Sequence, residues 1–440
     1  MKSKCVMMQA ALRRLQTRCA KLTDEMCSVK LQQNGQRNIQ VYEKGETQMK
    51  KTSRTRKLMK SVVLSLALAA VSFAGAAFAA PADANAAAVM ASQMKNSSIT
   101  ELTNDSRVFK VDKKIQTKMV RFQNRYGIEV AGHLYLPEHF DANKKYSAIV
   151  FSGPFGAVKE QSSGLYAQEM AKRGFVTVAF DCSFTGESGG NVHDVASPDI
   201  FTEDFHAAVD FVGLLPFVDK ERVGAMGICG LGGMAVTAAI NDVRIKAVAT
   251  SALYNMNDSI RNHYKGDYYT PAQRETVKGY LAEMRWKEAE LGKTLPGYHE
   301  VAIGADGKAV HATGEGVTLL PNKLPEGADP VTTDFFNYYK GRAFHPRAIN
   351  SNGIWSSTTP YGFFDFDLMA HVEELSPRPL LLITGDKAHS RYHSENVYER
   401  AKEPKELIVM PGATHCDLYD IYEKIPFERL DGFFTKHLGK

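Results

Sequence analysis

The chain has little cysteine and little tryptophan, with six and two of these residues among 440. Three of the cysteines lie before residue 30, so the rest of the chain holds only Cys182, Cys229 and Cys416. So few cysteines, odd in number, do not supply the disulfide framework of a small secreted domain, and they predict at least one free thiol. The length and the 44% hydrophobic content allow one large domain or two, with ordinary apolar cores.

Strong positive charge is also absent once the first 60 residues are set aside. The whole chain has 54 basic and 49 acidic residues. Residues 1–60 contain 15 of the basic and 4 of the acidic ones, which leaves 39 and 45 in the remainder and a net charge of −6. A mildly acidic body argues against a nucleic-acid partner, because phosphate backbones attract basic surfaces. The chain also lacks internal repeats.

Residues 50–79 have the pattern of an export signal. Lys and Arg residues at 50–60 precede an uncharged run rich in Ala, Leu and Val, residues 61–79, which closes on Ala77-Phe78-Ala79. The pattern predicts a cleaved signal peptide over residues 49–79 and an exported protein, periplasmic or secreted, that does not stay in the membrane. An uncleaved anchor is the alternative, since the run is just long enough to span a bilayer. We expect translation to start at Met49 and residues 1–48 to be a non-native upstream extension.

The mature chain alternates apolar strands with helical periodicity. We expect a flexible lead-in over residues 80–106 and one α/β domain over 107–440. Apolar runs such as 146–151, followed by segments of helical period such as 201–215, predict a mostly parallel sheet with helices on both faces. Residues 255–359 break this rhythm and are rich in aromatics, which predicts a large cap over the active site.

The segment Gly227-Ile228-Cys229-Gly230-Leu231-Gly232-Gly233 joins a predicted strand to a predicted helix. Glycines allow a tight turn that pushes a side chain outward, and the helix N-terminus favours a thiolate and a developing oxyanion. The segment therefore indicates a nucleophile elbow with Cys229 as the nucleophile. Leu231 stands where the G-x-S-x-G motif has its second glycine, so a glycine-rich packing turn with an inert cysteine is the alternative.

Two further residues follow later apolar runs in the order nucleophile, acid, histidine, which is the α/β-hydrolase order. Asp386 follows the run 380–384, and His415 follows the run 407–410. Nearby His389 and His393 stand four residues apart, but no third ligand is evident, so we expect no metal site.

With these residues the chain resembles the α/β-hydrolase superfamily over roughly residues 117–440, and it looks most similar to the branch of dienelactone hydrolase and acyl-peptidase-like bacterial hydrolases. The resemblance rests on the elbow and on four other motifs: SGPFGAVKE at 152–160, DCSFTGES at 181–188, GDKAHSRY at 385–392 and GATH at 412–415. It implies an α/β-hydrolase fold with a mostly parallel eight-stranded sheet, helices on both faces and a large cap insertion.

The resemblance also implies roles for single residues. Cys229 would be the nucleophile, His415 the general base, and the N–H groups of Gly230 and Phe155 the oxyanion hole. The family usually places its acid where Ala388 stands. This leaves Asp386 as the preferred acid, with Glu395 and Asp365 as alternatives.

The predicted function is an exported hydrolase that needs no cofactor. It would cleave an ester, thioester, lactone or related acyl bond of a small molecule through a Cys-His-acid triad and an acyl-enzyme. One alternative is a catalytically impaired binding protein on the same fold. Another is a redox-gated enzyme in which Cys229 pairs with Cys182 or Cys416.

Overall fold

The computed structural model describes residues 96–263, 269–311 and 320–440. The predicted upstream extension, the signal peptide and most of the predicted lead-in therefore lie outside the described residues. Within those three ranges, no helix combines the length and the apolar character needed to cross a membrane.

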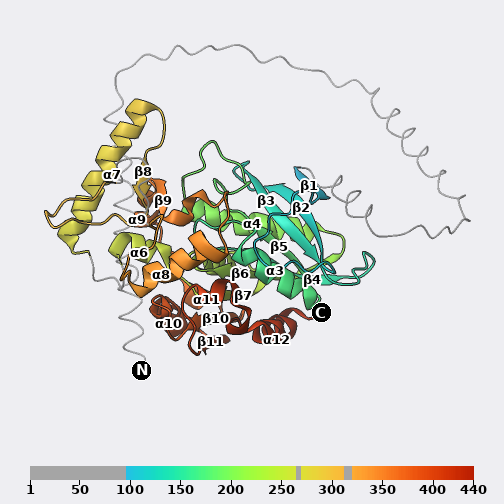
Figure 1. The fold of residues 1–440 in the computed structure, drawn as a ribbon. Helices are drawn as coiled ribbons and strands as arrows, with labels where there is room; N and C mark the ends of the chain where they lie inside the picture. Colours follow the sequence, from blue (N-terminus) through green and yellow to red (C-terminus); the bar gives the residue numbers. More distant parts are fainter. Residues whose placement is uncertain (1–95, 264–268, 312–319) are drawn as a thin grey trace, which may run out of the picture. The chain divides into compact units, whose positions relative to one another are not determined.

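A nine-stranded sheet forms the centre of the fold (Figure 1), in the order β1-β2-β3-β5-β4-β6-β7-β10-β11. From β5 to β11 neighbouring strands are parallel, and from β1 to β5 they are antiparallel. The strands are β1 (Ser97–Glu101), β2 (Gln116–Gln123), β3 (Glu129–Leu136), β4 (Tyr146–Ser152), β5 (Val176–Phe180), β6 (Val218–Ile228), β7 (Ile245–Ser251), β10 (Leu380–Gly385) and β11 (Lys405–Met410).

The sheet has one strand more than the eight predicted. Strand β1 lies inside the segment 80–106, which was expected to be a flexible lead-in, and it pairs antiparallel with β2 from Ser97↔Phe122 to Glu101↔Lys118. Ile99 is its one strongly apolar side chain and is buried. A single apolar residue among Ser, Thr and Glu gives no alternating pattern, so the sequence did not indicate this edge strand.

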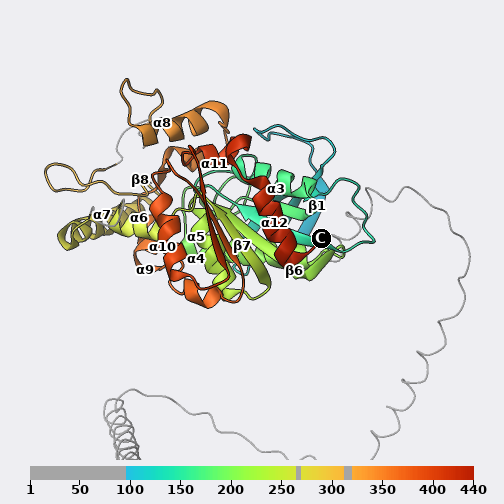
Figure 2. The same ribbon diagram turned by 90° about the horizontal axis from the view of Figure 1, so that it is seen from below.

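Helices cover both faces of the sheet, as predicted. One face carries α3 (Ser162–Lys172) and α12 (Phe427–Leu438), which Figure 2 shows near each other, and the other carries α4 (Pro198–Leu214), α5 (Leu231–Asn241) and α10 (Arg391–Arg400). Strand β4 shows why its apolar run is continuous: Ala148 and Val150 belong to one core, while Ile149 and Phe151 belong to the other.

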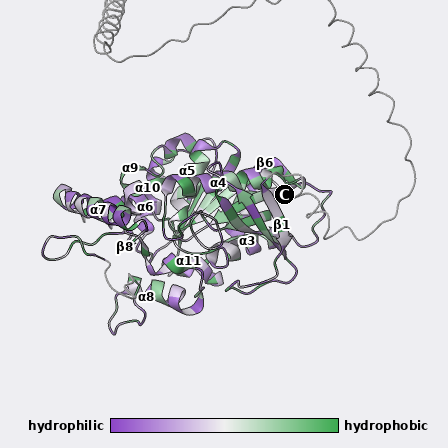
Figure 3. Cartoon of the chain, turned by 90° about the horizontal axis from the view of Figure 1, so that it is seen from above, coloured by the Kyte–Doolittle hydropathy of each residue, from purple (hydrophilic) through white to green (hydrophobic). Residues whose placement is uncertain are grey.

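The long segment between β7 and β10 holds the residues predicted as a cap. Its elements are α6 (Met256–Asn262), α7 (Pro271–Leu291), β8 (Pro296–Tyr298), α8 (Pro330–Phe336), β9 (Ile354–Ser356) and α9 (Pro360–Asp365). Helix α7 extends away from the sheet (Figure 1), and much of it is hydrophilic (Figure 3). Shorter elements of the chain are a π-helical turn at Asn337–Arg342, 3₁₀ turns at Ile349–Asn352, Val372–Leu375 and Tyr422–Lys424, and α11 (Asp417–Asp420).

The turn from β6 into α5 depends on a very close backbone approach. A Cβ atom on Gly227 would lie 2.2 Å from the carbonyl oxygen of Leu231 and 2.6 Å from Cα of Gly232. Both contacts are with backbone that cannot rotate away. This close approach therefore requires a glycine at position 227.

We expect Gly227→Ala to destabilise the protein by at least about 1–3 kcal/mol, because the added methyl overpacks against backbone. Urea unfolding measures this change. Gly279→Ala in α7 is the matched control, since its Cβ meets nothing within 4 Å. Alanine inside a helix should stabilise by roughly 0.5–1 kcal/mol. Equal midpoints for Gly227→Ala and the parent protein would contradict this account of the turn.

Candidate active site

Cys229 occupies the turn between β6 and α5 with φ = 55°, a backbone conformation that side chains other than glycine seldom adopt. Three backbone hydrogen bonds hold it there. The Cys229 N–H donates to Ser251 O at 2.9 Å, and the Cys229 carbonyl accepts from the N–H of Gly232 at 2.9 Å and of Tyr254 at 3.0 Å. The side chain lines a cavity of about 430 Å³. The structure therefore has the backbone geometry of a nucleophile elbow.

His415 lies beside this thiol, with Nε2 3.4 Å from Cys229 Sγ. It stands between β11 and α11 and is fully buried. Asp334 of α8 hydrogen-bonds to the residues on either side of His415. Its carboxylate accepts hydrogen bonds from the Thr414 hydroxyl at 3.0 Å and from the Cys416 N–H at 2.9 Å. The fold thus brings together two predicted site residues that are 186 positions apart in the chain.

The two predicted oxyanion donors also meet at the thiol. The backbone N–H groups of Gly230 and Phe155 lie near Cys229 Sγ and act to lower the pKa of the thiol, which favours the thiolate. Phe155 reaches this place because the loop after β4 lies directly on the elbow: a Cβ on Gly153 would be 2.4 Å from Ile228 O. Two N–H groups that converge on a nucleophile form a site for the oxygen of a tetrahedral intermediate.

The Nδ1 atom of His415 faces a serine. Ser390 Oγ lies 2.5 Å from Nδ1. Ser390 is buried just before α10, five residues after Gly385. Asp386, the preferred acid, is instead exposed on the turn after β10, where its N–H donates to Met410 O at 3.1 Å. The chain carries on past Asp386 through a turn closed by the Ala388 N–H and Gly385 O, and that turn delivers Ser390 to the histidine.

The two alternative acids also lie elsewhere. Glu395 pairs with Arg391 at 2.7 Å on α10, and Asp365 is exposed at the end of α9, beside a different cavity. Among the residues that the structure describes, no carboxylate is hydrogen-bonded or ion-paired to His415. The geometry therefore gives a Cys229–His415–Ser390 arrangement in place of the predicted Cys-His-acid triad.

The sequence reasoning missed Tyr419. Its hydroxyl lies 2.7 Å from His415 Nε2 and also lies near the Cys229 thiol, whose pKa it acts to lower. Tyr419 stands on α11, four residues after His415 in the chain. This spacing was visible in the sequence and is the signal that would have indicated the contact.

Burial determines the charge states of Cys229 and His415. It raises the pKa of the Cys229 thiol, although hydrogen bonds from Tyr419, Gly230 and Phe155 act in the opposite direction. It also lowers the pKa of His415 well below 6.5, and the nearby His389 and His393 add to this effect. Each shift favours the uncharged form, so the resting site holds a thiol and a neutral imidazole.

The cavity wall comes mostly from the segment between β7 and β10. Apolar and aromatic lining side chains include Met256, Leu320, Phe335, Tyr339 and Trp355. Tyr339 is one of the aromatics of the predicted cap that line the cavity. Two other aromatics of that segment do not: Trp286 is 74% exposed on α7, and Phe336 packs against the core. Helical period alone did not show which aromatics face inward.

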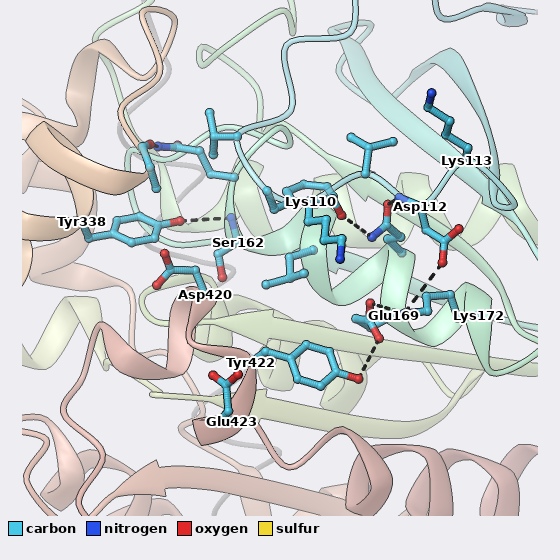
Figure 4. Close-up of a pocket in the computed structure, with 17 residues that line it drawn as sticks. Lys110, Asp112, Lys113, Ser162, Glu169, Lys172, Tyr338, Asp420, Tyr422 and Glu423 are labelled. Atoms are coloured by element: carbon cyan, nitrogen blue, oxygen red, sulfur yellow. Dashed lines mark hydrogen bonds and ion pairs between the residues drawn. The ribbon is translucent and has the colours of Figure 1, made fainter.

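A larger cavity, of about 730 Å³, lies along α3 (Figure 4). One of its charged side chains, Lys172, lies 2.9 Å from Glu169 and 3.9 Å from Asp112. Neither Cys229 nor His415 lines it. Cys229 lines the smaller cavity instead.

In the described ranges, no three His, Cys, Asp or Glu residues are arranged to hold a metal ion. His389 and His393, once considered as ligands, pack their rings around Tyr254, with centroids 5.8 Å and 4.6 Å away. Cys182, Cys229 and Cys416 are free and buried, so the structure contains no disulfide between them.

Comparisons with known proteins agree with this architecture. Residues 126–290 match the model of the X-Pro dipeptidyl-peptidase (S15) family, a stretch that contains Cys229 and ends before His415. Protein PA2218 of Pseudomonas aeruginosa is 48% identical over 340 residues, which cover 77% of this chain and 85% of that protein. Its crystal structure covers 77% of this chain and 99% of that chain, with a TM-score of 0.69. The chain belongs to the α/β-hydrolase superfamily, in the family of PA2218.

Two more distant proteins are also similar to this α/β-hydrolase. Thiohydrolase aneE of Aspergillus aculeatus is 27% identical over 230 residues, 52% of this chain and 70% of that protein. The α/β-hydrolase GrgF of Penicillium is 20% identical in structure-based comparison, covers 74% of this chain and 99% of that chain, and has a TM-score of 0.57. The second likeness supports the fold alone. The narrower placement near dienelactone hydrolase stays a prediction.

We expect iodoacetamide to alkylate Cys229 of this hydrolase slowly at pH 7 and faster as the pH rises past 9. The reason is that only the thiolate reacts, and burial raises the thiol pKa above its usual 9.0. Peptide mapping by mass spectrometry separates Cys229 from Cys182 and Cys416. Cys229→Ser is the control. An alkylation plateau that persists at pH 5–6 would reveal a thiolate–imidazolium pair and contradict the neutral resting state.

Proposed function

We propose that this protein hydrolyses an ester, a thioester or a related acyl bond through Cys229 and a covalent acyl-enzyme. One observation carries the proposal: an elbow cysteine lies 3.4 Å from a histidine and faces two backbone N–H donors in a cavity. The match to a peptidase family and the likeness to a thiohydrolase support acyl chemistry at this place in the fold.

In the acylation step, Cys229 Sγ attacks the acyl carbon while the thiol proton passes to the Tyr419 oxygen and the Tyr419 hydroxyl proton passes to His415 Nε2. The carbonyl electrons move to oxygen, which accepts hydrogen bonds from Gly230 N–H and Phe155 N–H. When the tetrahedral intermediate collapses, the bond to the leaving group breaks and His415 returns the proton to that group. Cys229 then holds the acyl group as a thioester.

In the deacylation step, His415 Nε2 takes a proton from water while the water oxygen attacks the thioester carbon. The same two N–H groups receive the second oxyanion. Collapse breaks the carbon–sulfur bond, and the proton on His415 returns to Cys229. A carboxylic acid leaves, and the site regains its neutral thiol and neutral imidazole.

Tyr419 serves both charge states of the pair. In the neutral state its O–H donates to His415 Nε2, and the thiol donates to the phenolic oxygen. After proton transfer the imidazolium donates to that oxygen, and the O–H donates to the thiolate. One hydroxyl thus supports reactant and ion pair without a change of position, as both contacts exist in the structure.

The partner at Nδ1 favours esters and thioesters over amides. Ser390 fixes the ring orientation but carries no charge to stabilise an imidazolium, as a carboxylate would. Thiolate and alkoxide leaving groups need less proton donation than an amine. The alternative is a catalytically impaired binding protein, motivated by Leu231 in the elbow and by the missing acid. A thioester substrate panel separates the two, because a binding protein releases no thiol.

We also propose that the protein is exported, on the strength of the basic stretch and the A-x-A site at 77–79. We expect N-terminal sequencing of secreted or periplasmic protein to begin at or next to Ala80. Expression from Met49 should give the same product. A mature protein that retains the uncharged run 61–79 would instead identify a membrane anchor.

Substitutions at the site should separate the geometry seen here from the triad predicted by sequence. We expect Cys229→Ala and His415→Ala each to reduce kcat/KM by at least about a thousandfold, and the double variant to be no worse. Ser390→Ala should cost about tenfold to a hundredfold, since it removes a hydrogen bond to a charged imidazolium. The measurement is thiol release from acyl thioesters.

Asp386→Asn is the matched control for Ser390→Ala and should stay within about twofold of the parent protein, because Asp386 is exposed. If Asp386→Asn loses most of its kcat/KM while Ser390→Ala keeps the kcat/KM of the parent protein, Asp386 and not Ser390 supports His415. Full activity of Cys229→Ala would exclude the proposed mechanism.

A further inference from the structure

The loop directly after β8 places two hydrogen-bond acceptors side by side in the wall of the cavity that Cys229 lines. His299 and Glu300 both line the cavity that contains Cys229. His299 Nε2 lies 3.9 Å from Glu300 Oε1. Neither residue takes part in the mechanism above.

His299 presents a lone pair to the cavity. Its Nδ1–H donates to Gly353 O at 3.1 Å, and burial lowers the pKa of the imidazole, which keeps the ring neutral. With the hydrogen on Nδ1, Nε2 is an acceptor. The ring packs against Phe155, with centroids 5.8 Å apart, so it is held in this orientation.

Glu300 is a carboxylate without a cation. Its side chain is 18% exposed, and burial alone raises its pKa to about 7. Within the described part of the chain, no lysine or arginine forms an ion pair with it. Glu300 and Cys229 line the same cavity, and the charge of Glu300 opposes ionisation of the Cys229 thiol. Carboxylates in such positions are normally paired, and one left unpaired in a reactive cleft is a candidate for ligand binding.

We propose that Glu300 and His299 bind a protonated amino group of the substrate, so that the protein acts on amine-bearing acyl compounds. An ammonium has three donors and no acceptor, which complements two acceptors and no donor. If one ammonium nitrogen donates two hydrogen bonds of about 2.8 Å at roughly a right angle, its two acceptor atoms lie about 4 Å apart. The distance between His299 Nε2 and Glu300 Oε1 is close to this, at 3.9 Å. An anionic substrate would instead be repelled.

The same contact would help the nucleophile. A bound ammonium offsets the negative charge of Glu300 and so removes part of what opposes the Cys229 thiolate. A neutral acyl compound lacks this effect. The substrate class named here rests on the proposed acyl chemistry, whereas binding of the amine itself does not.

The test uses hexanamide and its 2-, 4- and 6-amino derivatives, titrated by calorimetry into Cys229→Ala at pH 7.5. We expect at least one amino derivative to bind at least about tenfold more tightly than hexanamide. In Cys229→Ala with Glu300→Gln, the ratio of the two affinities should fall to about one. Glu395→Gln on α10 is the matched control and should keep the ratio. Thermal unfolding checks that each variant is folded.

Equal or weaker binding of every amino derivative, or a preference that survives Glu300→Gln, would overturn the inference. The S-ethyl thioesters of the same acids, given to the protein with Cys229 intact, test the reaction separately. Hydrolysis of the hexanoyl thioester without any amine preference would overturn the inference and leave the proposed function standing. An amine preference in binding without any hydrolysis would support the inference and reject the proposed function.

Discussion

The contact between Gly227 and the backbone of Leu231 and Gly232 is the constraint on which the site depends. Because β6 turns into α5 with almost no connecting chain, Cys229 must adopt a left-handed conformation at the end of a buried strand. This places Sγ above the carboxyl edge of a parallel sheet, where loops from other strands meet. The loop after β4 brings Phe155 there, and the loop after β11 brings His415. The remaining parts of the site are arranged around a thiol whose position is fixed by backbone alone.

The same burial that protects the site also keeps it uncharged. An exposed Cys–His pair can rest as thiolate and imidazolium, but here desolvation opposes both charges, and no carboxylate of the described residues contacts the histidine. In the proposed reaction, charge must therefore appear at the moment when Gly230, Phe155 and Tyr419 can stabilise it. The proposed mechanism thus depends on a correctly placed acyl group.

The sequence could predict the parts of the fold that repeat a strong pattern. Continuous apolar runs, as in β4, and the glycines around Cys229 led to the superfamily, to the parallel sheet and to a set of residues that the structure brings together, Cys229, His415, Gly230 and Phe155. It failed where the outcome depends on which way a short turn points. Asp386 and Ser390 stand four residues apart after the same strand, and only the turn closed by Ala388 and Gly385 decides that the serine reaches His415. In the same way, nothing in the sequence of α7 indicated that Trp286 faces solvent.

Asp334 links α8 to the loop that carries His415, the proposed base. It belongs to α8, yet its carboxylate binds the residues on either side of His415, Thr414 and Cys416. Any movement that lifts α8 from the body breaks both hydrogen bonds and releases the loop that orients the imidazole. His415 therefore keeps its orientation only while α8 stays in place. In the proposed mechanism, an acyl-enzyme could not be exposed by lifting α8 without also displacing the histidine that would hydrolyse it.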